Sequence, residues 1–140
     1  MKNLWLIFLL FVLMSFRQDS RYKLTISTDG FKEIKGVLEI GLFNKEQGFL
    51  KTNSRIRFIR IPVNEPVVSY TFAGLPAGYY AVSLYHDVNS DKKCNRNMLG
   101  IPKESYGFSN NFKPFLSTPD FDDAKFYLNS DTTITIHLIH

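Results

Sequence analysis

Apolar and polar residues alternate along most of this chain, and such alternation is typical of β-strands that bury one face. Tyr22, Leu24 and Ile26 fall on one side of the first such segment, and Leu38, Ile40 and Leu42 on one side of the next. The pattern predicts seven strands, within residues 22–28, 36–43, 54–61, 67–72, 78–86, 122–129 and 131–140.

The segments between these strands carry turn signals, such as Leu75-Pro76 and Ala77-Gly78, and none carries a long helical stripe. In residues 54–61 the apolar parity slips between Phe58 and Ile59, which predicts a β-bulge. Each strand has one apolar face that only a second sheet can cover. The expected fold is therefore all-β, an antiparallel β-sandwich of about seven strands of the prealbumin-like or immunoglobulin-like Greek-key type.

Composition agrees with a packed core, because 44% of the 140 residues are hydrophobic and 15% are aromatic. We expect a single domain over residues 16–140. Its single cysteine, Cys94, excludes an intrachain disulfide and is interpreted as an incidental free thiol.

The N-terminus carries an apolar run of eleven residues, Leu4 to Met14, between Lys2 and the polar residues from Arg17 onward. A transmembrane helix needs about 20 apolar residues, so residues 1–15 are predicted to be a secretory signal peptide. The expected location is periplasmic or extracellular, with attachment to the cell surface left open and no stable membrane span after signal removal. An uncleaved N-terminal anchor is the alternative, because small residues are scarce at the cleavage site.

The formal net charge of +4 is mild. Its one basic concentration, Arg55, Arg57 and Arg60, is interleaved with isoleucine and phenylalanine, and we interpret it as a solvated strand face. A nucleic-acid surface requires denser positive charge, so nucleic acid is excluded as a partner.

Between His86 and Phe121 the alternation stops for about 35 residues, whereas connections in compact domains are usually about 4 to 6 residues long. The segment is rich in apolar residues, glycine and proline, so we expect an ordered loop, residues 86–121, folded over the sandwich.

Residues 86–126, HDVNSDKKCNRNMLGIPKESYGFSNNFKPFLSTPDFDDAKF, resemble the signature of the exported bacterial family catalogued as domain of unknown function 2141. The shared submotifs are His-Asp-x-Asn, Leu-Gly-Ile-Pro-x-Glu, Gly-Phe-Ser-Asn-Asn and Pro-x-Phe-Asp-Asp-Ala. The resemblance extends from about Tyr22 to the C-terminus. It implies a small exported β-domain whose role is unassigned. The hairpin formed by residues 70–87 separately resembles one that is common in prealbumin-like and carboxypeptidase-regulatory-type sandwiches.

Oxygen-bearing residues follow the strand of residues 78–86 at every second position. They match the first, third, fifth, seventh and ninth positions of a calcium-binding loop, supplied here by Asp87, Asn89, Asp91, the Lys93 carbonyl and Asn95. Calcium is therefore the candidate cofactor. The alternative interpretation is a turn in which the Asp and Asn side chains bind their own backbone.

Three departures weaken the calcium motif, and one of them is the positive charge that Lys92 and Lys93 place beside the candidate cation. Lys92 stands where glycine normally relieves the turn, and a left-handed conformation there costs about 1–2 kcal/mol. Met98 stands where a bidentate glutamate closes the site. Glu104, Asp122 or Asp123 could return from the long loop to complete the shell.

We expect a binding or structural module whose loop contacts a protein or a glycan through aromatic rings and amides. The candidate partner residues are Tyr106, Phe108, Asn110, Asn111 and Phe112. Ser109 and the two asparagines also suit a purely structural turn.

The alternative from another functional class is a small exported hydrolase that uses His86, Asp87 and Glu104 for acid-base work. Ser105 and Ser109 are potential nucleophiles, but neither stands in a Gly-x-Ser-x-Gly elbow. No catalytic residue is assigned.

Overall fold

A computed structural model describes residues 19–98 and 102–140. The predicted signal peptide, residues 1–15, lies outside the described residues. The strands are β1 (Arg21–Asp29), β2 (Val37–Phe43), β3 (Arg57–Pro62), β4 (Val68–Pro76), β5 (Gly78–Asp87), β6 (Tyr106–Phe108), β7 (Phe126–Leu128) and β8 (Thr132–His137). Within the described residues the helices are short: η1 (Thr52–Ser54), η2 (Ser109–Asn111) and α2 (Phe121–Ala124).

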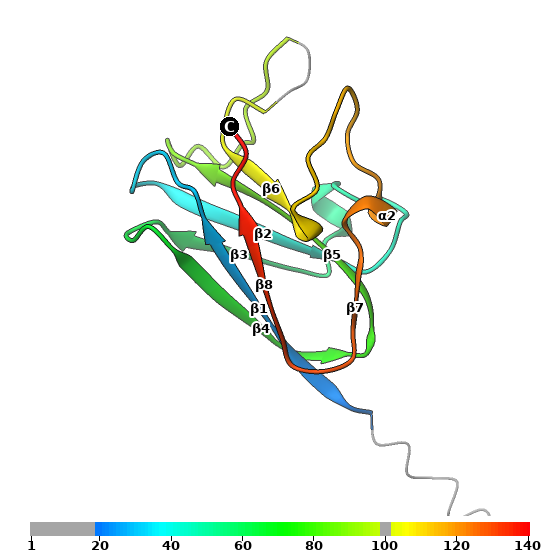
Figure 1. Cartoon of the computed structure of the whole chain (residues 1–140). Coiled ribbons are helices and arrows are strands. Elements are labelled where there is room, and N and C mark those ends of the chain that lie inside the picture. Colours follow the sequence, from blue (N-terminus) through cyan, green and yellow to red (C-terminus); the bar gives the residue numbers. More distant parts are fainter. Residues whose placement is uncertain (1–18, 99–101) are drawn as a thin grey trace, which may run out of the picture.

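The strands form two sheets (Figure 1). One has three strands in the order β4-β1-β8, and the other has five, with β3-β2-β5-β6 in line and β7 also paired to β5. The all-β, sandwich-like fold predicted from the alternation is confirmed. One pairing corrects the antiparallel prediction, because β1 and β8 run parallel. The specific likeness to prealbumin-like or immunoglobulin-like Greek keys stays a prediction.

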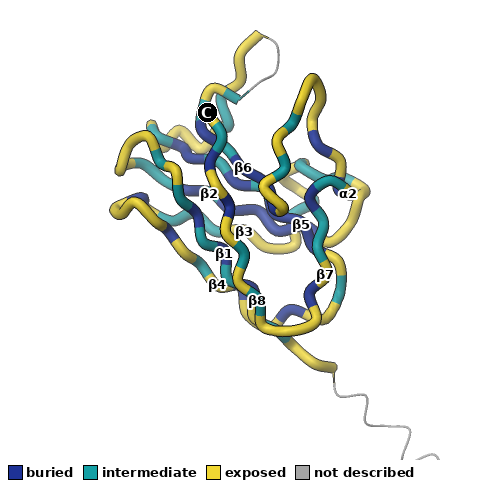
Figure 2. Tube along the Cα trace, viewed as in Figure 1, coloured by how far each residue is buried: buried dark blue, intermediate teal, exposed yellow. Residues whose placement is uncertain are grey.

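The main core lies between the two sheets, where the inward-facing side chains of both are buried (Figure 2). The alternation explains this burial, because residues two apart on a strand point to the same face. Fully buried members of this core are Leu24, Ile26, Leu38, Ile40, Leu42, Val82, Leu84 and Ile136. Burying such a side chain contributes about 1.5–3 kcal/mol before the loss of chain entropy is counted.

Two strand predictions need correction. Strand β3 pairs with β2 in continuous register, so no bulge separates Phe58 from Ile59; Phe58 simply faces outward. The register shift lies in β1 instead, between Tyr22 and Leu24. The segment predicted as a strand over residues 122–129 is helix α2 followed by the three-residue β7.

The described part of the predicted long loop is ordered and contains β6, η2 and α2. Strand β6 pairs with the second half of β5, while β7 pairs with the first half along the same edge. Gly107 permits this packing, because a Cβ atom there would lie 2.7 Å from Ile136 Cγ2 and 3.2 Å from Leu84 Cδ1.

A second, smaller apolar cluster lies on the outer face of the five-stranded sheet and anchors the C-terminal part of the long loop. We call it the outer cluster; its buried members are Phe43, Ala81, Phe108, Phe121 and Ala124. Among the described residues, no helix is long and apolar enough to cross a membrane.

Candidate functional site

Strand β5 ends with two adjacent buried residues, His86 and Asp87, whose side chains point to opposite faces of the sheet. His86 points into the sandwich, where its Nε2 lies 2.7 Å from the Lys35 carbonyl oxygen and its ring packs edge-on against Phe31. Asp87 points outward. The hydrolase hypothesis required His86, Asp87 and Glu104 to converge, so the placement of His86 is a correction to it.

The Asp87 carboxylate organises the turn that follows β5. It accepts hydrogen bonds from the backbone N–H groups of Asp91 (3.1 Å) and Lys92 (2.9 Å). It also accepts a charged hydrogen bond from Arg60 Nη2 at 2.6 Å. Gly36 lets a neighbouring turn approach this point, because a Cβ atom there would lie 2.4 Å from the Asp87 carbonyl oxygen.

Asp91 is the second acidic residue of this turn. Its carboxylate accepts hydrogen bonds from Lys93 N (2.8 Å), Asn95 Nδ2 (2.9 Å) and Asn89 Nδ2 (3.1 Å). These bonds, with that from Asn95 first, hold the pKa of Asp91 below its usual value. The two asparagines predicted as oxygen ligands thus direct N–H groups at Asp91. The turn interpretation is supported by side chains that bind the local backbone, since Asn89 Oδ1 accepts a hydrogen bond from Asp91 N at 3.3 Å.

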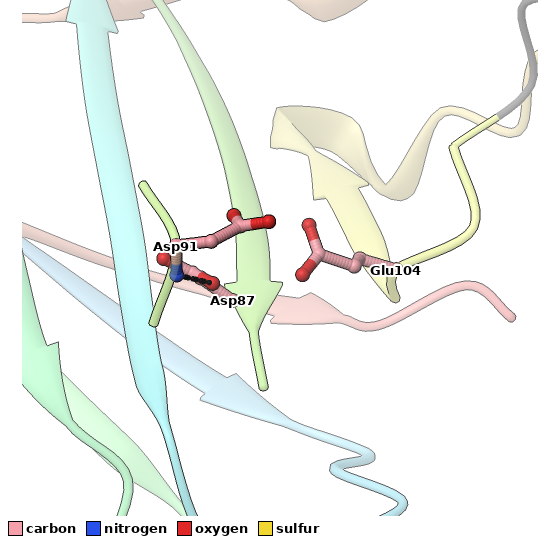
Figure 3. Close-up of side chains that lie close together, drawn as sticks. All are labelled: Asp87, Asp91 and Glu104. Atoms are coloured by element: carbon pink, nitrogen blue, oxygen red, sulfur yellow. Dashed lines mark hydrogen bonds between the residues drawn. The ribbon is translucent and has the colours of Figure 1, made fainter. Parts of the chain in front are cut away.

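Glu104 is the acidic residue that returns to this turn. It precedes β6 and points toward Asp87 and Asp91 (Figure 3). Carboxylate oxygens of the three residues lie within 4.8 Å of one another, and Glu104 Oε2 also accepts a hydrogen bond from Asn95 N at 3.4 Å. We call these three residues the carboxylate cluster.

The electrostatics of the carboxylate cluster are unfavourable for three ionised groups. Burial, reinforced by the negative charges of Asp87 and Asp91, raises the pKa of Glu104. The other acidic candidates lie elsewhere, since Asp122 pairs with Lys125 and Asp123 accepts a hydrogen bond from Asp120 N in α2. A divalent cation bound among these oxygens would offset the repulsion.

Two of the departures from the calcium motif have clear structural counterparts. Lys92 adopts φ 63°, the left-handed conformation for which glycine is normally used at this position. Met98 is fully exposed and cannot serve as a closing ligand. Ligation by Asp87, Asn89, Asp91, Lys93 and Asn95 stays a prediction.

A network of ion pairs beside the carboxylate cluster was missed by the sequence analysis. Glu39 on β2 accepts hydrogen bonds from Arg55 and Arg60, both at 2.5 Å, and Arg60 continues to Asp87. The predicted solvated strand face is wrong for these two arginines, whereas Arg57 is exposed as expected. An available signal was the polar Glu39 inside an otherwise apolar strand.

The predicted partner residues mostly contact the protein itself. Phe108 is buried in the outer cluster, with Tyr106 and Phe112 packed against it. Asn110 Nδ2 donates to the Lys125 carbonyl at 2.9 Å, and Asn111 bonds the backbone of β8. Phe108 is therefore not available to a partner, and partner contact by the remaining residues stays a prediction.

The candidate nucleophiles have structural roles as well. Ser109 is buried; its Oγ accepts a hydrogen bond from Val82 N at 2.9 Å and donates to the Ala124 carbonyl at 2.5 Å. Ser105 Oγ lies 2.7 Å from His140 Nδ1. Cys94 is half-buried, and burial raises the pKa of its thiol, so it is not an activated thiolate.

Comparison with known proteins gives one match. The sequence profile of a family described as "Uncharacterized protein conserved in bacteria (DUF2141)" matches residues 26–136. No curated protein and no solved structure matches the chain.

Proposed function

Because the chain belongs to the DUF2141 family of uncharacterised bacterial proteins, whose description states no activity, we propose a function from the geometry of the carboxylate cluster. The protein is a β-sandwich binding or structural module in which a calcium ion braces the segment between Asp87 and Glu104. The observation that carries this proposal is the approach of three carboxylates to within 4.8 Å of one another.

Those carboxylates come from two places in the chain. Asp87 and Asp91 belong to the turn after β5, and Glu104 belongs to the segment that enters β6. An ion bound to all three side chains would therefore link the turn after β5 to the segment that enters β6. Carboxylate oxygens are the ligands that calcium prefers, and its flexible coordination of 6 to 8 oxygens tolerates an irregular set.

The neighbouring residues shape what this site could hold. Arg60 occupies one oxygen of Asp87, which lowers the negative charge available to a cation. Asn89 and Asn95 could add amide oxygens after rotation of their side chains, since both already face Asp91. Such a site suits the weak affinities, about 10⁻⁴ to 10⁻³ M, of extracellular calcium modules.

The test is the melting temperature of the purified protein in calcium, in magnesium and in chelator. A ligand at 100 times its Kd stabilises the folded state by about 2.7 kcal/mol, so calcium should raise the melting temperature by several degrees. Asp91→Asn and Glu104→Gln should remove most of this response. Glu65→Gln, an exposed carboxylate on another loop, is the matched control and should keep it.

Asp87 is unsuitable for this test, because its loss would remove one of the two carboxylate partners of Arg60 whether or not calcium binds. Glu104→Gln gives a sharper result. The pKa of Glu104 is raised in the folded protein, so its ionised form costs stability that returns as the pH falls. In chelator the Gln variant should therefore melt at or above the wild-type temperature, and in calcium below it.

Equal calcium responses in the wild type and in both cluster variants would refute the bracing role.

An exported location belongs to the same proposal and is supported by the apolar run from Leu4 to Met14. Calcium is abundant outside the cytoplasm, where a weak site could fill. Cell fractionation of the native host tests this directly. Recovery of the protein in the cytoplasm with residues 1–15 intact would contradict it.

A further inference from the structure

Two adjacent apolar side chains stand in solvent at the tip of the loop between η2 and α2. Phe115 is 82% exposed and Leu116 is 93% exposed. Apolar residues scattered singly over a surface need no explanation, but a pair at a protruding tip indicates an interaction site. Leu116 also adopts φ 63°, a conformation that is costly for a residue with a branched side chain and that tends to occur at functional sites.

The base of this loop, which we call the apolar-tipped loop (residues 113–120), is fixed. Phe112, which precedes the loop, packs against the outer cluster, and Phe121, which follows the loop, is buried in that cluster. Pro119 is buried too, and Pro114 restricts the other limb. The tip is thus displayed by an anchored loop.

A third apolar side chain is exposed on a segment at the same end of the molecule. Met98 is fully exposed on the segment that leaves the turn after β5. Figures 1 and 2 show this segment and the apolar-tipped loop rising from one end of the sandwich, opposite the end where β1 begins.

The charge at this end is positive. Between residues 88 and 120 the chain has five basic residues and three acidic ones. Two of the acidic residues, Asp91 and Glu104, belong to the carboxylate cluster, and the third, Asp120, is exposed at the end of the apolar-tipped loop. The basic residues are exposed: Lys92, Lys93, Arg96, Lys103 and Lys113.

We propose that this end of the protein docks on an anionic lipid surface, with Phe115 and Leu116 entering the headgroup region and the basic residues facing the headgroups. Apolar side chains flanked by lysine and arginine are the combination that such interfaces bind. A lipid surface accepts exposed apolar side chains of any shape, whereas a protein partner would need a matching pocket for each. This inference does not depend on calcium binding.

The experiment is sedimentation with vesicles of phosphatidylcholine alone and of phosphatidylcholine mixed equally with phosphatidylglycerol. The protein is used as the full chain and as residues 16–140, because the apolar run Leu4–Met14 can bind vesicles itself. The shorter form is used after a cooperative melting transition has shown that it folds. We expect it to bind the anionic vesicles, and added salt to weaken that binding.

The variant Phe115→Ser with Leu116→Ser should weaken binding by at least about tenfold, because it removes the apolar side chains that enter the headgroup region. Both positions are exposed, so the fold should be unaffected. Ile34→Ser with Val67→Ser, which removes two exposed apolar residues from other loops, is the matched control and should bind as the wild type does. Lys103→Glu with Lys113→Glu should abolish the preference for phosphatidylglycerol, whereas Lys45→Glu with Lys51→Glu should not.

Insertion of the tip can be observed directly. The one tryptophan of the chain, Trp5, is absent from residues 16–140, so Phe115→Trp introduces a single reporter. Its emission should shift to the blue when anionic vesicles are added. Absence of wild-type binding to the vesicles, or binding that the Phe115/Leu116 variant retains, would overturn the proposal and leave a protein partner for this end.

Discussion

Lys92 adopts a left-handed backbone conformation in the turn that carries the candidate ligands. This conformation destabilises a residue with a Cβ atom by about 1–2 kcal/mol. Glycine avoids that strain, although the greater entropy of glycine in the unfolded chain offsets part of the gain. Lys92→Gly should therefore stabilise the protein by about 1 kcal/mol in urea unfolding.

Lys93→Gly is the matched control for this variant. Lys93 is not among the residues with positive φ, so glycine brings only the entropic penalty and should destabilise the protein. If both glycine variants lose stability to the same extent, the strain at Lys92 is not real.

Arg60 is the residue that satisfies the buried charge of Asp87. Removal of one partner of a buried ion pair leaves an uncompensated charge, so Arg60→Ala should lower the free energy of unfolding by about 3–5 kcal/mol. Arg57→Ala, on the exposed face of the same strand, should stay within about 0.5 kcal/mol of the wild type. Chemical denaturation of the three proteins measures the difference.

Arg60 and a bound cation would compete for Asp87. Calcium should therefore recover a larger part of the stability in Arg60→Ala than it adds to the wild type. The absence of any extra calcium response in this variant would place the ion away from Asp87.

Tyr85 lies beside the same network, opposite Glu39 in the strand register. Burial, with a contribution from the Glu39 charge, raises the pKa of Tyr85 to about 12. Since this value exceeds the unfolded pKa of about 10, the stabilisation from neutral Tyr85 is complete below pH 10 and disappears as the pH rises through about 12.

Wild-type protein should consequently lose stability above about pH 10 more steeply than Tyr85→Phe does. Urea unfolding at several alkaline pH values gives this slope, and ultraviolet absorbance follows tyrosinate formation. Tyr127→Phe, at a half-exposed tyrosine, should retain the wild-type slope.

At the residue scale the sequence was informative where the chemistry is local. The oxygen-bearing turn and the left-handed backbone at Lys92 could both be predicted from consecutive residues. The pairing of Arg60 with both Glu39 and Asp87 does not, because it depends on the register of three strands. Glu104 was only one of three acidic residues predicted to complete the calcium site, because its approach to the turn also depends on the packing of distant segments.

At the scale of elements, Ser109 joins three pieces of the structure. It bonds both to Val82 in β5 and to the last residue of α2, Ala124. Ser109→Ala should cost about 1–3 kcal/mol, because buried backbone groups would lose their partner. Ser117→Ala, in the exposed part of the apolar-tipped loop, should have no measurable effect on thermal unfolding.

Element prediction succeeded for the long strands and failed for the short ones. Alternation over six or more residues identified β1, β2, β4, β5 and β8. Strand β6 has only three residues, too few to show a period, and it exists because Gly107 lets it pack against Ile136. Helix α2 has four residues and is defined by its capping box, in which Asp120 N donates to Asp123 Oδ2 at 2.9 Å.

At the scale of the whole molecule, the two-layer architecture followed from the need to cover one apolar face of every strand. Strand order did not follow, because the same alternating segments fit many topologies. The parallel pairing of β1 with β8 brings segments together from opposite ends of the sequence.

The central strand of the three-stranded sheet is the first to be synthesised, and its parallel neighbour is the last. While the ribosome is still translating, Leu24 and Ile26 in β1 lack the strand that completes their sheet. This half of the molecule can therefore close only after β8 has left the ribosome. If the protein is exported as proposed, a chain that is still open there can be threaded through a translocation pore without first being unfolded.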